Sequence, residues 1–149
     1  MNKETFNRLK KVNDIFSEID FTYHEIARQS GLSNSEFNVL YTLCELGNGC
    51  LLSLAYKHNG TSRQTIESAV RKLEKNELMY LQAGEGRKKT MWLTPKGETF
   101  VEEKIKPILK MEEEILSAWQ EEELVQYLHL NQKYLDDLRQ KFNEYNRSK

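Results

Sequence analysis

Apolar residues recur every three or four positions over most of this chain, which is the spacing of one face of an α-helix. From Glu4 to about Gln29 this spacing predicts one long helix, which Ser30-Gly31 ends with the glycine as a left-handed cap. A second helix is expected from Ser33 or Asn34 to about Leu46, because Ser33 and Glu36 have the spacing of a capping box. The N-terminal third of the chain is therefore helical.

Two shorter helices follow, separated by a tight turn. Residues 51 to 58 predict a third helix, which Cys50 opens and the turn-forming pair Asn59-Gly60 closes. A fourth helix is expected to begin at Thr61, because Thr61 and Gln64 again have capping-box spacing. The apolar stripe that it should bury consists of Ile66, Ala69, Val70 and Leu73. Two short helices joined in this way are typical of a helix-turn-helix.

The pattern changes character after Asn76. Residues 78 to 82 and 90 to 94 are short runs with aromatic and β-branched residues, and residues 84 to 89 between them are glycine-rich and basic, so we expect a β-hairpin with a basic tip. Thr94-Pro95 then reads as a helix cap followed by proline in the first turn. A long helix follows, interrupted near Pro107, and a last helix runs from about Glu121 to Tyr145.

Charge is distributed unevenly, although the net charge of the 149 residues is only -1. Between Lys57 and Gly97 nine basic residues stand against four acidic ones, whereas the rest of the chain holds thirteen basic and nineteen acidic residues. A basic centre with acidic flanks is expected if only the centre meets the phosphates of a nucleic acid.

The composition indicates a strongly helical protein of the cytoplasm. Residues 1 to 4 include an acid and lead into no apolar signal region, and the best apolar run, residues 50 to 55, is far too short to cross a bilayer, so we expect no membrane association. Cys44 and Cys50 form no disulfide framework, and we interpret both as small buried apolar residues rather than redox sensors.

The fourth helix has the dimensions to enter a major groove. A helical wheel centred on its apolar stripe points Gln64, Ser68, Arg71 and Lys75 most directly away from the core, with Arg63, Thr65, Glu67 and Lys72 beside them. The first turn offers Ser62, Arg63, Gln64 and Thr65 to base edges, where glutamine suits adenine and arginine suits guanine.

The hairpin tip offers Arg87, Lys88 and Lys89, which suits one arginine in a minor groove and two lysines on phosphates. The alternative is that Arg71, Lys72 and Lys75 only solvate a helix face and pair with Glu67 and Glu74. A basic hairpin directly after the helix favours the interpretation as a DNA-binding surface.

These segments resemble a known family. Residues 61 to 76, with Leu-Glu-Lys at 73 to 75, and the later Leu93-Thr94-Pro95-Lys96-Gly97 are similar to the recognition helix and to the Leu-Thr-x-x-Gly motif after the wing of MarR-type regulators. The resemblance covers roughly residues 4 to 146. It departs at the wing, where Glu85-Gly86-Arg87 replaces the usual Asp-x-Arg, and at residues 50 to 58, which match the usual third helix weakly.

The resemblance implies a mainly α fold, a winged helix-turn-helix flanked by N- and C-terminal dimerisation helices. Residues 1–30 would be the first dimerisation helix, residues 33–97 the DNA-binding lobe and residues 98–149 the remaining dimerisation helices. Effectors, where they exist in the family, bind between the dimer interface and that lobe, and we assign no effector residues.

No catalytic or metal-binding motif is present, so we expect no enzyme, metal or cofactor. The sequence has no nucleophile elbow, phosphate loop or paired carboxylates, and its three histidines are scattered without metal-ligand spacing. The first hypothesis is a homodimeric transcription regulator, a repressor that binds double-stranded DNA at an inverted repeat. The second is a dimeric winged-helix module that binds protein and not DNA, which the net negative charge and the altered wing favour.

Overall fold

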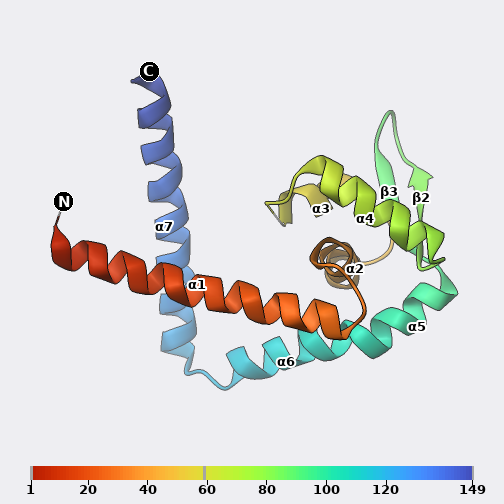
Figure 1. Ribbon diagram of the computed structural model, residues 1–149, viewed down its shortest axis with the longest axis horizontal. Coiled ribbons are helices and arrows are strands. Elements are labelled where there is room, and N and C mark those ends of the chain that lie inside the picture. The colour runs from red at the N-terminus through yellow and green to blue at the C-terminus, as the bar shows by residue number, and fades with distance from the viewer. Residues whose placement is uncertain (1, 59, 149) are drawn as a thin grey trace. The chain divides into compact units, whose positions relative to one another are not determined.

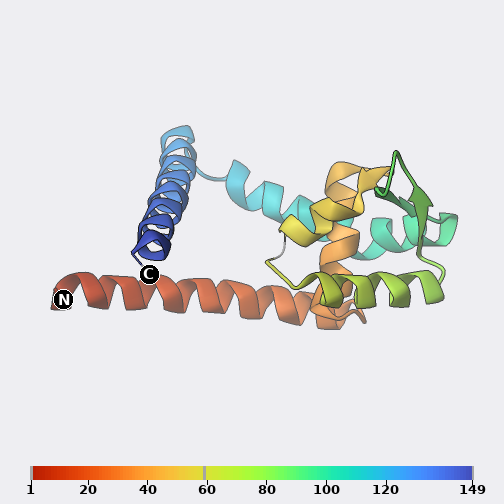
Figure 2. The same ribbon diagram turned by 90° about the horizontal axis from the view of Figure 1, so that it is seen from above.

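The computed structural model describes residues 2–58 and 60–148, without the side chain of residue 58. The chain divides into two compact units, Met1–Pro107 and Ile108–Lys149. The described residues form seven helices and a small sheet, which confirms the predicted mainly α fold with a β-hairpin wing (Figures 1 and 2). The helices are α1 (Lys3–Gln29), α2 (Asn34–Leu46), α3 (Leu52–His58), α4 (Arg63–Lys75), α5 (Pro95–Lys104), α6 (Lys106–Ser117) and α7 (Glu121–Arg147). The strands are β1 (Cys50–Leu51), β2 (Met79–Ala83) and β3 (Lys89–Leu93).

The predicted start of α2 and the predicted end of α1 are confirmed. The hydroxyl of Ser33 accepts a hydrogen bond from the backbone of Glu36, and the Glu36 carboxylate accepts one from the backbone of Ser33, so the capping box is complete. Gly31 has a φ of +75°, the left-handed conformation that terminates α1. Local side-chain chemistry thus sets both helix ends.

The core of the first unit lies between α2 and α4. The four residues of the predicted stripe on α4 are all buried: Ile66, Ala69, Val70 and Leu73. Opposite them, Leu40 and Leu43 of α2 are almost completely buried. This packing holds α4 by one side only, which leaves its other side exposed.

The predicted start of the third helix is wrong by one or two residues. Cys50 and Leu51 do not begin the third helix; they form β1, which pairs antiparallel with Met91 and Thr90 of β3. The backbone of Gly49 donates to Met91, so the chain is already extended beside β3 when it reaches Cys50. The predicted turn at Asn59-Gly60 lies partly outside the described residues, because residue 59 is not described.

The cap of α4 is Ser62 rather than Thr61. The Ser62 hydroxyl accepts a hydrogen bond of 3.2 Å from the backbone of Thr65, and the two hydroxyl groups lie 2.7 Å apart. The predicted cap at Thr61 is therefore one residue too early, because serine and threonine are adjacent here and both can cap.

The wing is a three-stranded sheet in the order β1-β3-β2. Its strands are shifted by one residue from the prediction, and Tyr80 pairs across β2 and β3 with Trp92, whose ring it stacks on at 6.5 Å. The turn at the tip is closed by a hydrogen bond of 2.8 Å from the backbone of Gly84 to the carbonyl of Lys88. The basic tip is thus carried by a paired hairpin.

The Leu-Thr-x-x-Gly motif joins the wing to α5. The Thr94 hydroxyl caps α5 by accepting from the backbone of Gly97 and donates to the carbonyl of Glu77, while the backbone of Thr94 donates to the carbonyl of Leu78. Gly97 lies so close to that carbonyl that a Cβ at this position would be 1.7 Å from its oxygen. The close contact between the wing and the start of α5 therefore depends on both Thr94 and Gly97.

The long helix predicted after the wing is interrupted, as expected near Pro107. α5 ends at Lys104, the fully buried Ile105 separates the two helices, and α6 begins at Lys106. A proline in the first turn of α6 has no N–H to leave unpaired, so the new helix starts without loss of a hydrogen bond.

The second unit contains most of α6 and the whole of α7, and none of the described residues of these two helices is buried. Trp119 packs edge-on against Tyr127 at 5.2 Å. Further along α7, large apolar side chains such as Leu138 and Phe142 are more than half exposed. None of the helices that the structure describes has the length and apolar content that a membrane crossing requires.

Glu77 has a φ of +59°, unusual for a residue with a side chain, at the end of α4. Glu77→Gly is expected to raise the free energy of unfolding by about 0.5 kcal/mol, because relief of the left-handed strain exceeds the added entropy of the unfolded chain. Chemical denaturation would measure it. Glu98→Gly, at an exposed helical position in α5, should have the opposite sign, and a destabilised Glu77→Gly would contradict the argument.

Candidate nucleic-acid interface

The exposed side of α4 carries the residues that the helical wheel pointed outward. All eleven predicted DNA-contacting residues are exposed in the structure: Ser62, Arg63, Gln64, Thr65, Ser68, Arg71, Lys72, Lys75, Arg87, Lys88 and Lys89. The first eight belong to α4 and its cap, and the last three to the wing tip and the start of β3. Exposure makes these side chains available to a ligand.

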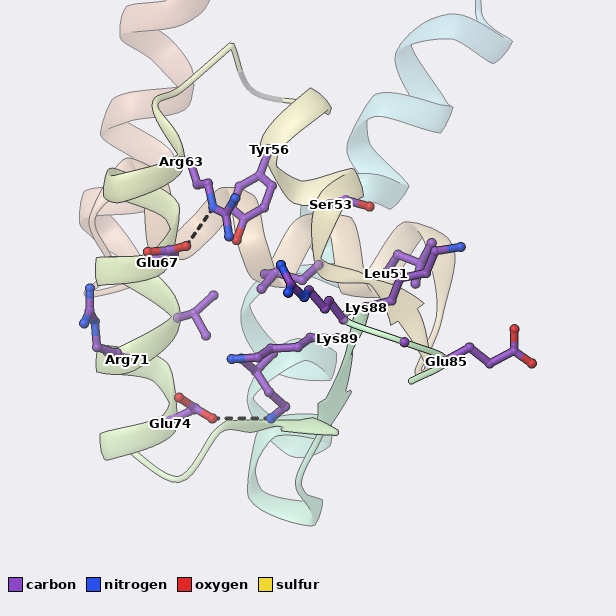
Figure 3. A pocket seen from close by; sticks show the side chains of 15 residues that line it. Leu51, Ser53, Tyr56, Arg63, Glu67, Arg71, Glu74, Glu85, Lys88 and Lys89 are labelled. Atoms are coloured by element: carbon purple, nitrogen blue, oxygen red, sulfur yellow. Dashed lines mark hydrogen bonds and ion pairs between the residues drawn. The ribbon is translucent and has the colours of Figure 1, made fainter. Parts of the chain in front are cut away.

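A hollow of about 830 Å³ lies between α3, α4 and the wing. Figure 3 shows Arg63, Glu67 and Arg71 in order along α4, with Lys88 and Lys89 of the wing reaching toward the helix. The basic residues around it are Arg63, Arg71, Arg87, Lys88 and Lys89, and the acidic ones are Glu67, Glu74 and Glu85. We call this feature the α4–wing hollow.

The hollow brings together five of the eleven predicted residues from segments separated by the whole of β2. Arg71 of α4 and Arg87 of the wing both line it, so they lie on the same side of the unit. Ser62, Gln64, Thr65, Ser68, Lys72 and Lys75 are not among its lining residues. The predicted surface is therefore a ridge along α4 with the wing beside it.

The acidic residues of α4 pair differently from the alternative prediction. Glu67 binds Arg63, with 2.9 Å between Nε and Oε1, and Glu74 accepts a hydrogen bond of 3.3 Å from the backbone of Leu81 in β2. In the part of the chain that the structure describes, no ion pair involves Arg71, Lys72, Lys75, Arg87, Lys88 or Lys89. In the described part of the chain, these six cations are therefore not held in ion pairs.

The wing tip has no stiffening ion pair among the described residues. Glu85 and Arg87 form none, and Figure 3 shows the Glu85 carboxylate pointing away from the α4–wing hollow. Instead, the backbone of Lys88 donates to the carbonyl of Glu85, and Gly86 takes a φ of +65°. Backbone hydrogen bonds and one glycine shape this tip.

Tyr56 of α3 is the residue of the hollow that the sequence analysis missed. The Arg63 guanidinium lies 5.5 Å from the centre of its ring, within the range of a cation–π contact. Partial burial raises the pKa of the Tyr56 hydroxyl, and the negative charge of Glu67 adds to this. The pKa of Glu67 is lowered, chiefly by its hydrogen bond with Arg63 and further by the charges of Arg63, Arg71 and Lys89.

Comparison with known proteins identifies the fold. A regulator of the MarR family from Neisseria meningitidis superposes with a TM-score of 0.76 over 98% of this chain and 99% of the other, at 20% identity. This chain has the MarR fold. A MepR–DNA complex from Staphylococcus aureus matches at 23% identity and a TM-score of 0.63, covering 93% of this chain and 98% of MepR. No protein-family profile and no curated protein sequence matches the chain.

A third similar structure, BpsR from Bordetella bronchiseptica, is 22% identical with a TM-score of 0.60, and the match covers 83% of this chain and 98% of BpsR. Its DNA binding is described as regulated by 6-hydroxynicotinic acid. The Neisseria protein is named a MarR family regulator, and MepR is named a transcription regulator. Among the described residues of this chain, no cluster of three His, Cys, Asp or Glu side chains could hold a metal.

The two cysteines are free and half-buried. Burial raises the pKa of the Cys44 thiol and also that of the Cys50 thiol. Because a raised pKa lowers the thiolate fraction at pH 7, both should react with iodoacetamide more slowly than free cysteine, with rates that rise as the pH passes the ordinary thiol range. Mass spectrometry of Cys44→Ser and Cys50→Ser would follow each thiol. A rate at pH 7 equal to that of free cysteine would contradict this.

Proposed function

We propose that this protein is a DNA-binding transcriptional regulator of the MarR family, a repressor that binds an inverted-repeat operator as a homodimer. The observation that carries the proposal is the exposed basic surface of α4 together with the wing, whose Arg71 and Arg87 line one hollow. A helix of this kind fits a major groove roughly 12 Å wide, and a basic hairpin beside it reaches the neighbouring phosphates. The proposed partner is double-stranded DNA, and the proposed location is the cytoplasm.

Eight of the eleven exposed residues are assigned one of two roles. The first turn of α4, with Arg63 and Gln64, reads base edges, because arginine pairs with guanine and glutamine with adenine. Arg71, Lys72 and Lys75 and the three wing cations contact the backbone, with Arg87 suited to a minor groove. Ser62 and Thr65 use their hydroxyls within the cap, and both are exposed beside Arg63 and Gln64.

The terminal helices support a homodimer. α1 buries only Ala27 along its 27 residues, while the stripe predicted from sequence, including Phe6, Phe16 and Ile19, is exposed in the single chain. α7 buries none of its described residues. Apolar faces of this extent are typical of interaction surfaces. We assign residues 1–30 and 98–149 to dimerisation and residues 33–97 to DNA, with half-sites roughly 34 Å apart.

Binding to a random 30-base-pair duplex tests the function. We expect the dissociation constant to rise by a factor of about 100 or more between 50 and 200 mM salt, because several phosphate contacts release counterions. Sequencing the duplexes that the protein enriches from a random library would then identify an inverted repeat. Binding that is absent at low salt would overturn the proposal.

The second hypothesis, a winged-helix module that binds protein, keeps two observations in its favour. The net charge is -1, and the wing lacks an ion pair between Glu85 and Arg87. The same titration separates the two hypotheses, since a protein-binding module has no reason to bind duplex with a steep dependence on salt.

Sedimentation tests the homodimer. The chain should sediment at twice its mass of 17.6 kDa, and Leu138→Asp combined with Phe142→Asp should yield a folded monomer, because both side chains are exposed in the single chain. Gln140→Asp, at a polar position of the same helix, should remain dimeric. A wild-type chain that sediments as a monomer at micromolar concentration would contradict the assignment.

A small-molecule effector is a further partner that we propose by analogy with BpsR, whose DNA binding responds to 6-hydroxynicotinic acid. A compound that raises the melting temperature of the protein and releases the selected duplex would establish such an effector.

A further inference from the structure

Arg63 differs from the other cations of the DNA-facing surface because it is held from two sides. Glu67, one turn later on α4, binds its Nε at 2.9 Å, and the ring of Tyr56 lies 5.5 Å from its guanidinium carbon. The Arg63 side chain is nevertheless 77% exposed. Figure 3 shows the guanidinium in front of the Tyr56 ring at the mouth of the α4–wing hollow.

This arrangement leaves Arg63 able to bind another group. Glu67 uses Nε, whereas the N–H groups on Nη1 and Nη2 point along a different edge of the planar guanidinium. A pair of parallel donors matches the two acceptors, O6 and N7, that guanine presents in a major groove. An arginine ordered before binding also loses less conformational freedom when it contacts a base.

We propose that Tyr56 and Glu67 are positioning residues that hold Arg63 for bidentate recognition of a guanine in the operator. The inference rests on the proposed function, because it requires that α4 enters a major groove. Tyr56 belongs to α3, the first helix of the helix-turn-helix, and Arg63 belongs to α4, the second. In this proposal α3 therefore affects base preference by holding Arg63.

The Glu67 carboxylate affects general DNA affinity and base preference in opposite directions. A negative charge on the DNA-facing side repels phosphates of any sequence, so Glu67 lowers general affinity while it orders the side chain that reads a base. A residue with a merely structural role would change affinity for all sequences by the same factor. Loss of Glu67 should instead move general affinity and base preference in opposite directions.

The experiment uses the duplex that the wild-type chain selects from a random library and a second duplex with the best guanine position changed to adenine. Tyr56→Leu should lower the ratio of the two affinities roughly three- to five-fold per half-site, the value of an exposed cation–π contact. Tyr56→Phe keeps the aromatic face and loses only the interaction of the hydroxyl with Arg63 and Glu67, so it should retain most of the ratio. Circular dichroism and sedimentation confirm that each variant is folded and dimeric.

Glu67→Gln gives the second measurement and leaves the Tyr56 side chain itself unchanged. It should raise affinity for random duplex about two- to five-fold at low salt and lower the preference for the guanine duplex. Glu85→Gln is the matched control: it removes one acidic charge from the wing without touching Arg63, so it should raise general affinity and leave the preference unchanged.

A double-mutant cycle decides whether the effect passes through Arg63. In an Arg63→Ala background, Tyr56→Leu and Glu67→Gln should leave the affinity ratio unchanged. Unchanged ratios in the Arg63-containing variants overturn this inference, while the proposed function stands if the wild type selects a duplex. An increase in both affinity and preference on Glu67→Gln also overturns it, because Glu67 would then restrain Arg63. A wild type that binds no duplex overturns the proposed function.

Discussion

Gly97→Ala is expected to lower the free energy of unfolding by about 3 kcal/mol or more. The added Cβ would lie 1.7 Å from the carbonyl oxygen of Leu78 and 2.8 Å from its carbonyl carbon, and neither is the end of a flexible side chain. The start of α5 must move away, which strains the hydrogen bonds that Thr94 makes to Glu77 and Leu78. Overpacking costs about 1–3 kcal/mol and each lost hydrogen bond about 1 kcal/mol.

Thermal and chemical denaturation at one fixed protein concentration would measure this loss, since a dimer's melting point depends on concentration. The melting temperature should fall by roughly 10 °C. Gly84→Ala is the matched control, because it adds the same methyl group in the wing at a position where the nearest neighbour is 3.3 Å away. If the free energy of unfolding falls by less than about 1 kcal/mol in both variants, the contact between Gly97 and Leu78 is not rigid and the prediction is wrong.

Replacing Arg87 and Lys89 together by alanine should weaken binding to every duplex by roughly 100-fold at physiological salt. Both side chains are exposed at the wing, line the α4–wing hollow and have no ion pair in the described part of the chain, so their charge is available to phosphates. In a homodimer the change removes four cations, and the slope of log affinity against log salt should become shallower by about 2 to 4. The preferred base sequence should not change.

Gel-shift titrations at several salt concentrations would measure both quantities. The control combines Lys104→Ala with Lys133→Ala, which removes the same charge from exposed positions outside the basic segment and should leave the slope unchanged. Equal slopes for the wing variant and the wild type would show that the wing does not contact DNA. Replacement of Gln64 should instead relax base preference, at a cost on the order of 1–3 kcal/mol.

Sequence reasoning located most helices because their ends depend on near neighbours. The capping box of Ser33 and Glu36, the left-handed Gly31 and the cap at Thr94 each involve residues within a few positions of one another. The buried stripe of α4 is also local, since its period of 3.6 residues follows from helix geometry alone. The outward face of α4 could therefore be derived without coordinates.

Prediction from sequence failed where the local pattern fitted two structures equally well. Thr61 and Ser62 are both good caps, and the structure uses Ser62. Cys50 and Leu51 join a strand because they pair with Met91 and Thr90, about forty residues later. No local pattern encodes such a pairing, since a strand of two residues is too short to show a period.

By itself the sequence determined the helical framework, the wing, and the eleven polar and basic residues that the core leaves outside. Only the tertiary structure decided which of them meet: it placed Arg71 and Arg87 around one hollow, set Tyr56 against Arg63, and gave Gly97 its contact with Leu78. The physical reason is that helix periodicity depends on neighbouring residues, whereas contacts between α3, α4 and the wing depend on how the buried core packs them.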